Sequence, residues 1–189
     1  MSDRRQQLID TAIDLFYKNG IHATGIDTLL AKAGVAKMTL YKHFKTKDEL
    51  VLAALRTIDE RYRNNLMREV ERLGNTPVER LHALFDLQEI GISAAEFRGC
   101  AFVKFATEYS CHENPVHVVA AESKRLMLDY IRSLAAEAGA ADPETLALQL
   151  MLIQEGTNVY VLVTGRSPMI EARAAATQLI EQAISRRLN

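Results

Sequence analysis

The chain has 189 residues, of which 48% are hydrophobic and 25% charged, and its formal net charge is -1. This length and balance are typical of a globular protein with a buried core and exclude an intrinsically disordered chain. The charged N-terminal segment MSDRRQQLID excludes a signal peptide, and apolar runs of about six residues are far below the ~20 that a membrane helix requires. We therefore expect a cytoplasmic protein with no membrane contact.

Helical spacing of apolar residues begins at the N-terminus and predicts three helices within the first 50 residues. The first ends near Gly20, and the second ends at Gly34. The third is short and places Leu40 and Phe44 on one side. Two short helices joined by a tight glycine-containing turn are typical of a helix-turn-helix.

The rest of the chain continues the helical pattern, and no alternating strand pattern competes with it, so we predict an all-α fold. Thr46 with Glu49, and Thr76 with Glu79, have the spacing of capping boxes at helix starts. All four prolines are also predicted at helix starts: Pro77, Pro115, Pro143 and Pro168. The predicted helices, about nine in number, span residues 4–19, 26–33, 37–44, 47–73, 77–94, 97–112, 116–138, 143–164 and 168–187.

Charge is unevenly distributed over these helices. Residues 1–50 contain eight Lys or Arg and six Asp or Glu, whereas the remainder contains 15 and 18. The front of the chain is therefore weakly basic and the rest weakly acidic, so a polyanionic partner is to be sought at the front.

The third helix presents groups suited to DNA. Each residue turns ~100° around a helix, so inward-facing Leu40 and Phe44 leave an outward side of lysines and a methionine. These residues are Lys37, Met38, Lys42 and Lys45. Lysine donors suit guanine edges or phosphates, and methionine packs on a thymine methyl, which favours placement in the major groove. A solvated lysine face on a small bundle is the alternative.

A second group of residues suits phosphate oxygens, which position a protein on DNA without reading its sequence. Thr39, Tyr41 and His43 offer hydroxyl and imidazole groups beside the buried side of the third helix. Lys47 lies in the first turn of the next helix, where its charge opposes the helix dipole, so a phosphate partner explains it better.

The segment from Gly20 to Leu50, GIHATGIDTLLAKAGVAKMTLYKHFKTKDEL, resembles the DNA-binding domain of tetracycline-repressor-like (TetR family) regulators. The matching features are Gly20, Ala23-Thr24, Ala33-Gly34-Val35, Thr39-Leu40-Tyr41, His43-Phe44 and Lys47-Asp48-Glu49-Leu50. The resemblance implies a DNA-binding domain over residues 1–47 and a helical ligand-binding and dimerisation domain over 48–189. It also implies a homodimeric transcriptional repressor that binds a near-palindromic DNA operator and is released by a small molecule.

Carried over residue by residue, the resemblance implies that Lys37, Met38 and Lys42 face bases. It implies phosphate contacts by Thr24, Thr39, Tyr41, His43 and Lys47. Gly25 stands where these proteins often have Ser or Thr, which weakens the cap of the second helix and removes a hydroxyl suited to phosphate.

The last two helices, about 143–164 and 168–187, are the predicted dimer interface, because the resemblance implies that they pair with their copies. The 143–164 helix is independently apolar on most of its circumference and must be covered on several sides. The final helix offers small residues that permit close approach: Ala172, Ala174, Ala175, Ala176 and Ala183. An ordinary intradomain core is the alternative.

The resemblance also implies that helices five to eight enclose a cavity for an unidentified small-molecule effector. Apolar walls with a few polar groups are what such a pocket requires. The candidate ligand-binding residues are Phe85, Gln88, Phe102, Phe105, Tyr109, Glu155 and Asn158. Ordinary core is the alternative for the aromatic residues, and neither a cofactor nor a metal is predicted.

The two cysteines, Cys100 and Cys111, lie three turns apart on the predicted 97–112 helix. The rise alone separates them by ~16 Å, beyond the ~7 Å that a disulfide allows. Buried structural thiols are therefore expected, with an electrophile-sensing thiol as the alternative. Glu108 and His112 on the same helix have the spacing of a surface pair, with a ligand contact or weak metal chelation as alternatives.

Enzyme signatures are absent: the chain has no nucleophile elbow, glycine-rich phosphate loop, paired-carboxylate motif or zinc-ligand spacing. We therefore do not expect an enzyme. The other alternative is a DNA-binding adaptor whose C-terminal domain binds a protein. A closed apolar pocket would count against an adaptor, and a filled core with an exposed apolar patch would favour it.

Overall fold

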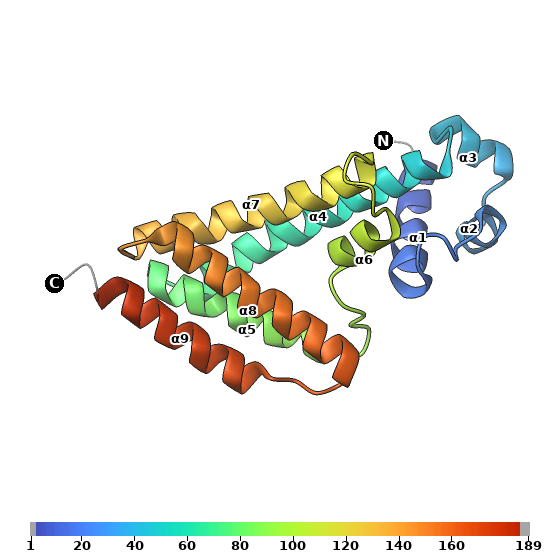
Figure 1. Cartoon of the computed structure of the whole chain (residues 1–189). Coiled ribbons are helices and arrows are strands. Elements are labelled where there is room, and N and C mark those ends of the chain that lie inside the picture. The colour runs from blue at the N-terminus through green and yellow to red at the C-terminus, as the bar shows by residue number, and fades with distance from the viewer. Residues whose placement is uncertain (1–2, 186–189) are drawn as a thin grey trace. The chain divides into compact units, whose positions relative to one another are not determined.

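The computed structural model describes residues 3–185, and over this range the chain forms helices and connecting loops without a β-strand (Figure 1). The all-α prediction is confirmed. The helices of residues 3–185 are α1 (Asp3–Asn19), α2 (Ile26–Ala33), α3 (Lys37–His43), α4 (Lys47–Leu73), α5 (Pro77–Ser93), α6 (Ala101–Glu108), α7 (Pro115–Glu137), α8 (Pro143–Thr164) and α9 (Met169–Ser185).

Most helix boundaries lie within two residues of their predicted places because local capping sets them. Thr76 and Glu79 form the predicted capping box at the start of α5. Three of the prolines open α5, α7 and α8, and Pro168 immediately precedes α9. The predicted capping box of Thr46 and Glu49 differs in one contact, because the Glu49 carboxylate accepts a hydrogen bond from the Lys45 N–H at 2.7 Å. Residues 186 and 187 of the last predicted helix lie outside the described residues.

The sixth helix is the exception, because the predicted span 97–112 is too long. Gly99 has φ +86°, outside helical geometry, and a Cβ at that position would lie 2.8 Å from Leu162 Cδ2. The helix therefore begins only at Ala101. It ends at Glu108, whose carboxylate binds backbone N–H groups of the α1–α2 loop. Long-range contacts thus determine the length of α6.

The shorter α6 overturns the predictions for the residues near its ends. Cys100 is the N-cap of α6 and Cys111 lies in the following loop, so they do not share a helix, although both are free thiols. Cys111 is also exposed rather than buried. His112 lies beyond the helix and stacks on His117 with ring centroids 4.5 Å apart, so the predicted Glu108–His112 surface pair is wrong.

The chain divides into two compact units, each with its own hydrophobic core. Unit 1 comprises Met1–Tyr62 and Cys100–Lys124, and unit 2 comprises Arg63–Gly99 and Arg125–Asn189. In unit 1, α6 and the start of α7 pack with the N-terminal helices, where Phe16 and Phe105 meet edge to face at 6.4 Å. Compactness alone does not assign function, so the predicted functional boundary at residue 47 stays a prediction.

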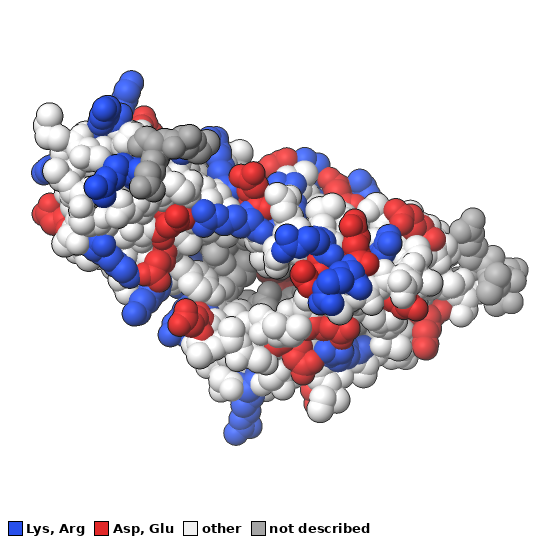
Figure 2. Space-filling view, turned by 180° about the vertical axis from the view of Figure 1, so that it is seen from behind, with Lys and Arg blue, Asp and Glu red and all other residues white. Residues whose placement is uncertain are grey.

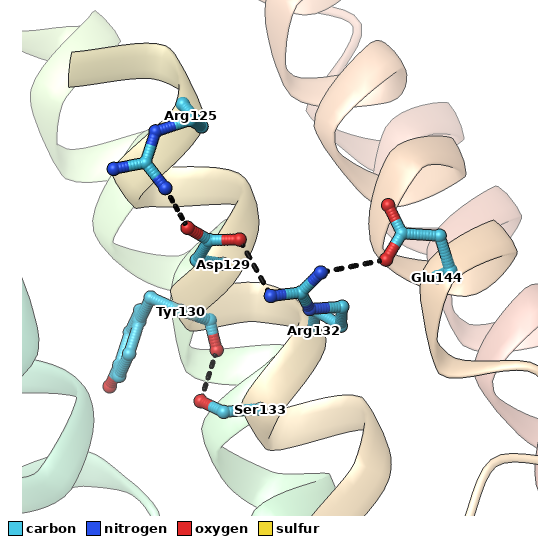
Figure 3. Close-up of polar contacts among 6 residues, drawn as sticks. All are labelled: Arg125, Asp129, Tyr130, Arg132, Ser133 and Glu144. Atoms are coloured by element: carbon cyan, nitrogen blue, oxygen red, sulfur yellow. Dashed lines mark hydrogen bonds and ion pairs between the residues drawn. The ribbon is translucent and has the colours of Figure 1, made fainter. Parts of the chain in front are cut away.

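Unit 2 is a helical bundle in which α8 lies beside α9 and both contact α5 (Figure 1). A chain of surface ion pairs joins α7 to α8 (Figure 3). Asp129 accepts from Arg125 at 2.7 Å and from Arg132 at 2.8 Å, and Arg132 reaches Glu144 on α8 at 3.1 Å. Such exposed pairs contribute only ~0–1 kcal/mol each, so the apolar core is the main source of stability in unit 2.

Candidate nucleic-acid interface

The turn between α2 and α3 is built by Gly34. This residue has φ 62° and ψ 35°, and its N–H donates to Leu30 O to close α2. Leu40 and Phe44, each 2% exposed, then anchor α3 in the unit 1 core. The predicted helix-turn-helix is therefore present, and burial of one side of α3 determines which side chains face outward.

The exposed side of α3 carries the predicted base-facing residues. Met38 is 84% exposed, and Lys37 and Lys42 beside it are also exposed. An exposed methionine between lysines has no packing role in the described chain. Figure 2 shows Lys and Arg side chains that project outward from the N-terminal helices.

The predicted phosphate-contacting residues of α3 surround this surface. Tyr41 is 45% exposed, and Thr39 and His43 are partly buried. His43 lines a groove of about 330 Å³ between α1, α3 and α4, together with Arg5 and Arg56. The structure thus brings these three residues together beside the exposed side of α3.

Lys47 is held by the protein itself. Its ammonium donates to Ile21 O at 2.6 Å and so ties the first turn of α4 to the α1–α2 loop. An ammonium has three N–H donors, so this bond leaves two for other acceptors. Its phosphate contact stays a prediction.

Thr24 is placed in the interior, contrary to the predicted phosphate contact. Its side chain is 1% exposed, and its hydroxyl donates to Gly20 O at 2.7 Å. A phosphate cannot reach a hydroxyl that is buried and already bonded. The neighbouring Gly25 is the N-cap of α2 and provides no side-chain hydrogen bond, as predicted.

Gly25 and Gly34 provide a matched pair of substitutions for this substructure. Gly25 has φ -73°, and a Cβ there would meet only Thr28 Oγ1 at 3.8 Å. We expect Gly25→Ser to cap α2 and raise the free energy of unfolding by about 0.3 kcal/mol. Gly34→Ser is expected to lower it by about 1–2 kcal/mol, because an L residue is strained at positive φ. Urea denaturation of both variants measures these free energies of unfolding. Equal changes in the two variants would contradict the assigned cap at Gly25 and turn at Gly34.

The predicted effector residues are divided between the two units. Phe102 and Phe105 are buried in the unit 1 core, and Tyr109 lies at the end of α6 and packs against that core. Phe85 is 1% exposed in the unit 2 core. The three phenylalanines therefore serve as core residues of their own units.

Two of the effector candidates do meet in unit 2. Gln88 on α5 donates from Nε2 to Asn158 Oδ1 at 3.0 Å and to Gln154 O at 2.7 Å, both on α8. Among the described residues, nothing bonds the buried Oε1 of Gln88. Glu155 lies partly buried on the same stretch of α8. A separate pocket of about 190 Å³ is lined by His82, Phe85, Arg173, Ala176 and Thr177.

Metal ligation is not indicated by the described part of the chain. Within residues 3–185, no group of three or more His, Cys, Asp or Glu side chains is placed to hold a metal ion.

Comparison with known proteins decides the family. The family model for "Bacterial regulatory proteins, tetR family" matches residues 8–54, which include α2, α3 and the first turns of α4. A crystal structure of SCO4454, a TetR-family transcriptional regulator from Streptomyces coelicolor, superposes with a TM-score of 0.86 at 28% identity. It covers 100% of this chain and 98% of that one. The chain belongs to the TetR family.

Two curated helix-turn-helix regulators match over less than half of this chain. The transcriptional activator FasR of Mycolicibacterium smegmatis is 38% identical over 82 residues, 43% of this chain and 36% of FasR. The regulator HbdR of Aromatoleum is 33% identical over 86 residues, 45% of this chain and 37% of HbdR. The chain thus spans little more than a third of these relatives. Its family is one of helix-turn-helix transcription regulators that bind DNA, rather than of enzymes.

Proposed function

We propose that this TetR-family protein is a homodimeric repressor that acts in the cytoplasm and whose two α3 helices read a near-palindromic operator. Residues 1–47 are the DNA-binding domain in this proposal, and residues 48–189 bind the effector and form the dimer. The observation that carries it is the combination of buried Leu40 with exposed Met38 and lysines on α3. An α-helix held in this way presents its outer side chains to base edges in the major groove.

Sequence-specific binding is tested by selection from a library of randomised 30-base-pair duplexes with the full chain. We expect an enriched near-palindrome whose half-sites lie about 10 base pairs apart, because that spacing is one helical turn of DNA. The enriched duplex is called the selected duplex below. Recovery of random sequence only would contradict the proposal.

The proposed dimer surface lies on α8. Four apolar side chains on one side of this helix are about half exposed or more: Leu148 at 48%, Leu152 at 63%, Val159 at 50% and Val163 at 76%. Gly156 lies in the same row, and nothing is within 4 Å of the position of a Cβ there. Spacings of three and four residues place this row on one side of the helix. A second copy of the chain would bury it.

On α9 the proposed surface draws on the exposed residues only. Ala172 and Ala176 are buried within unit 2, whereas Ala174 and Ala175 are exposed and Ile170 is 82% exposed. α8 is also long and apolar enough, by length and composition alone, to cross a membrane. A single such helix is weak evidence for a membrane, and a second copy of the chain accounts for the same apolar row.

The effector is proposed to bind in unit 2 beside Gln88 and Asn158. A buried acceptor without a partner costs ~1–3 kcal/mol, so a compound with an N–H or O–H donor would gain by bonding Gln88 Oε1. We expect an effector found by screening for release of the selected duplex to raise the thermal midpoint of the parent by several degrees. Asn158→Ala should lose at least half of that increase, whereas Arg132→Ala on the surface should keep it. An equal increase in both variants would contradict this site.

A second candidate is a regulator that binds a protein partner instead of a small molecule. The filled core around the phenylalanines and the exposed apolar row on α8 favour it. A chain that is monomeric in solution would support this candidate over the homodimer.

A further inference from the structure

The loop between α1 and α2 is held by side chains from distant parts of unit 1. α1 ends at Asn19, so its last carbonyls and the loop amides lack helical partners. Lys104 on α6 donates to Tyr17 O at 2.5 Å, and Lys47 on α4 donates to Ile21 O at 2.6 Å. Charged groups therefore satisfy the backbone of this loop.

Glu108 binds two amides of this loop at once. One carboxylate oxygen accepts from the Ile21 N–H at 2.8 Å, and the other accepts from the His22 N–H at 2.7 Å. Hydrogen bonds to an ionised acceptor are roughly twice as strong as neutral ones. Gly20 makes room for the carboxylate, since a Cβ there would lie 3.2 Å from Glu108 Oε1. The carboxylate therefore fixes two successive peptide groups.

Tyr109 extends the contact to α4. Its ring stacks on His22 with centroids 5.3 Å apart, and its hydroxyl donates to Asp48 at 2.7 Å. Burial, and then the hydrogen bond to Asp48, raise the pKa of Tyr109 well above its usual value. The hydroxyl therefore keeps its proton and donates to Asp48 at neutral pH.

The position of this loop determines where α2 begins. Only Ala23, Thr24 and Gly25 separate His22 from the first residue of α2, and the buried Thr24 hydroxyl bonds back to Gly20. α2 and α3 are joined by the Gly34 turn, so a displaced loop also displaces the exposed side of α3. DNA recognition tolerates little displacement, because base contacts depend on hydrogen-bond distances.

We propose that Lys104, Glu108 and Tyr109, here called the α6 clamp, are positioning residues that hold the helix-turn-helix in its DNA-binding geometry. The proposal rests on the proposed DNA-binding function. α6 begins two residues after the end of the unit 2 segment at Gly99, so it is the first helix of unit 1 that the chain forms on leaving unit 2.

The α6 clamp is tested with Glu108→Gln and a control that removes the same charge, Glu113→Gln. Glu113 is exposed in the next loop and bonds Cys111 rather than the α1–α2 loop. Loss of a negative charge alone would favour DNA, so weaker binding by Glu108→Gln has to arise from geometry. The affinity of each protein is measured for the selected duplex and for a scrambled duplex, with hydrogen exchange at the Ile21 and His22 amides.

Glu108→Gln is expected to bind the selected duplex at least tenfold more weakly than Glu113→Gln and to bind the scrambled duplex within twofold of it. The Ile21 and His22 amides should exchange at least tenfold faster. Affinity for the selected duplex within twofold of the control would overturn the proposal.

If Glu108→Gln loses its helical circular dichroism, Tyr109→Phe decides, because it removes only a hydroxyl. We then expect the affinity of Tyr109→Phe for the selected duplex to fall about threefold, with no change in its affinity for the scrambled duplex. An unchanged affinity for the selected duplex would overturn the proposal. A parent chain that enriches no sequence would refute the proposed function instead. The exchange rates of Ile21 and His22 would still support or overturn the clamp itself.

Discussion

A chain that carries Leu152→Glu and Val163→Glu is expected to be a monomer and to bind the selected duplex at least ~100-fold more weakly than the parent. Both side chains lie in the exposed apolar row of α8, at 63% and 76% exposure. Burying a Leu or Val side chain contributes ~1.5–3 kcal/mol, whereas burying an unpaired carboxylate costs several kcal/mol. In a two-fold symmetric dimer each substitution acts twice.

The matched control is Ala136→Glu, which also places a carboxylate at an exposed apolar position but on α7. Sedimentation equilibrium and duplex titration measure the three proteins under the same conditions. We expect the control to sediment and bind like the parent, and the double variant to retain its helical signal because neither residue is buried in the chain. A double variant that remains dimeric would contradict the α8 interface.

Lys42→Ala and Lys47→Ala are expected to weaken DNA binding in different ways. Lys42 is exposed on the outer side of α3, so its loss should cost ~1–3 kcal/mol per half-site and relax the preference at one or two base pairs. The Lys47 ammonium keeps two donors for a phosphate beside its bond to Ile21 O, so its loss should weaken binding to every duplex and reduce the salt slope by about one per protomer.

Titrations at four salt concentrations, with the selected duplex and its single-base-pair variants, separate these effects. Lys18→Ala is a suitable control, because Lys18 is an exposed lysine of α1 outside the proposed surface. Equal losses for Lys42→Ala and Lys18→Ala, or a salt slope unchanged by Lys47→Ala, would contradict the assigned roles.

The parts of the fold that were predicted correctly are those that neighbouring residues determine. The Gly34 turn, the capping box at Thr76 and the prolines at helix starts all act within about one helical turn of their position. The buried side of α3 followed from the spacing of Leu40 and Phe44. The exposed side, with Met38 and Lys42, followed from the same spacing.

The parts that were missed depend on residues far apart in the sequence. α6 is shorter than its apolar pattern because Gly99 packs on Leu162 and Glu108 binds the loop at Ile21, 87 residues away. Threonine is a residue type that often contacts phosphate, yet the Thr24 hydroxyl bonds Gly20 O within the α1–α2 loop. Sequence periodicity does not report such pairings, so the α6 clamp could be found only in the structure.

The central claim is that the exposed side of α3 reads DNA sequence, and one measurement tests it most directly. Duplex selection is performed in parallel with the parent and with a variant that carries Lys37→Ala, Met38→Ala and Lys42→Ala. All three side chains are exposed, so the variant should fold like the parent. We predict that the parent enriches one near-palindrome and that the variant enriches none while it still binds duplexes weakly. Enrichment of the same sequence by both proteins would contradict the claim.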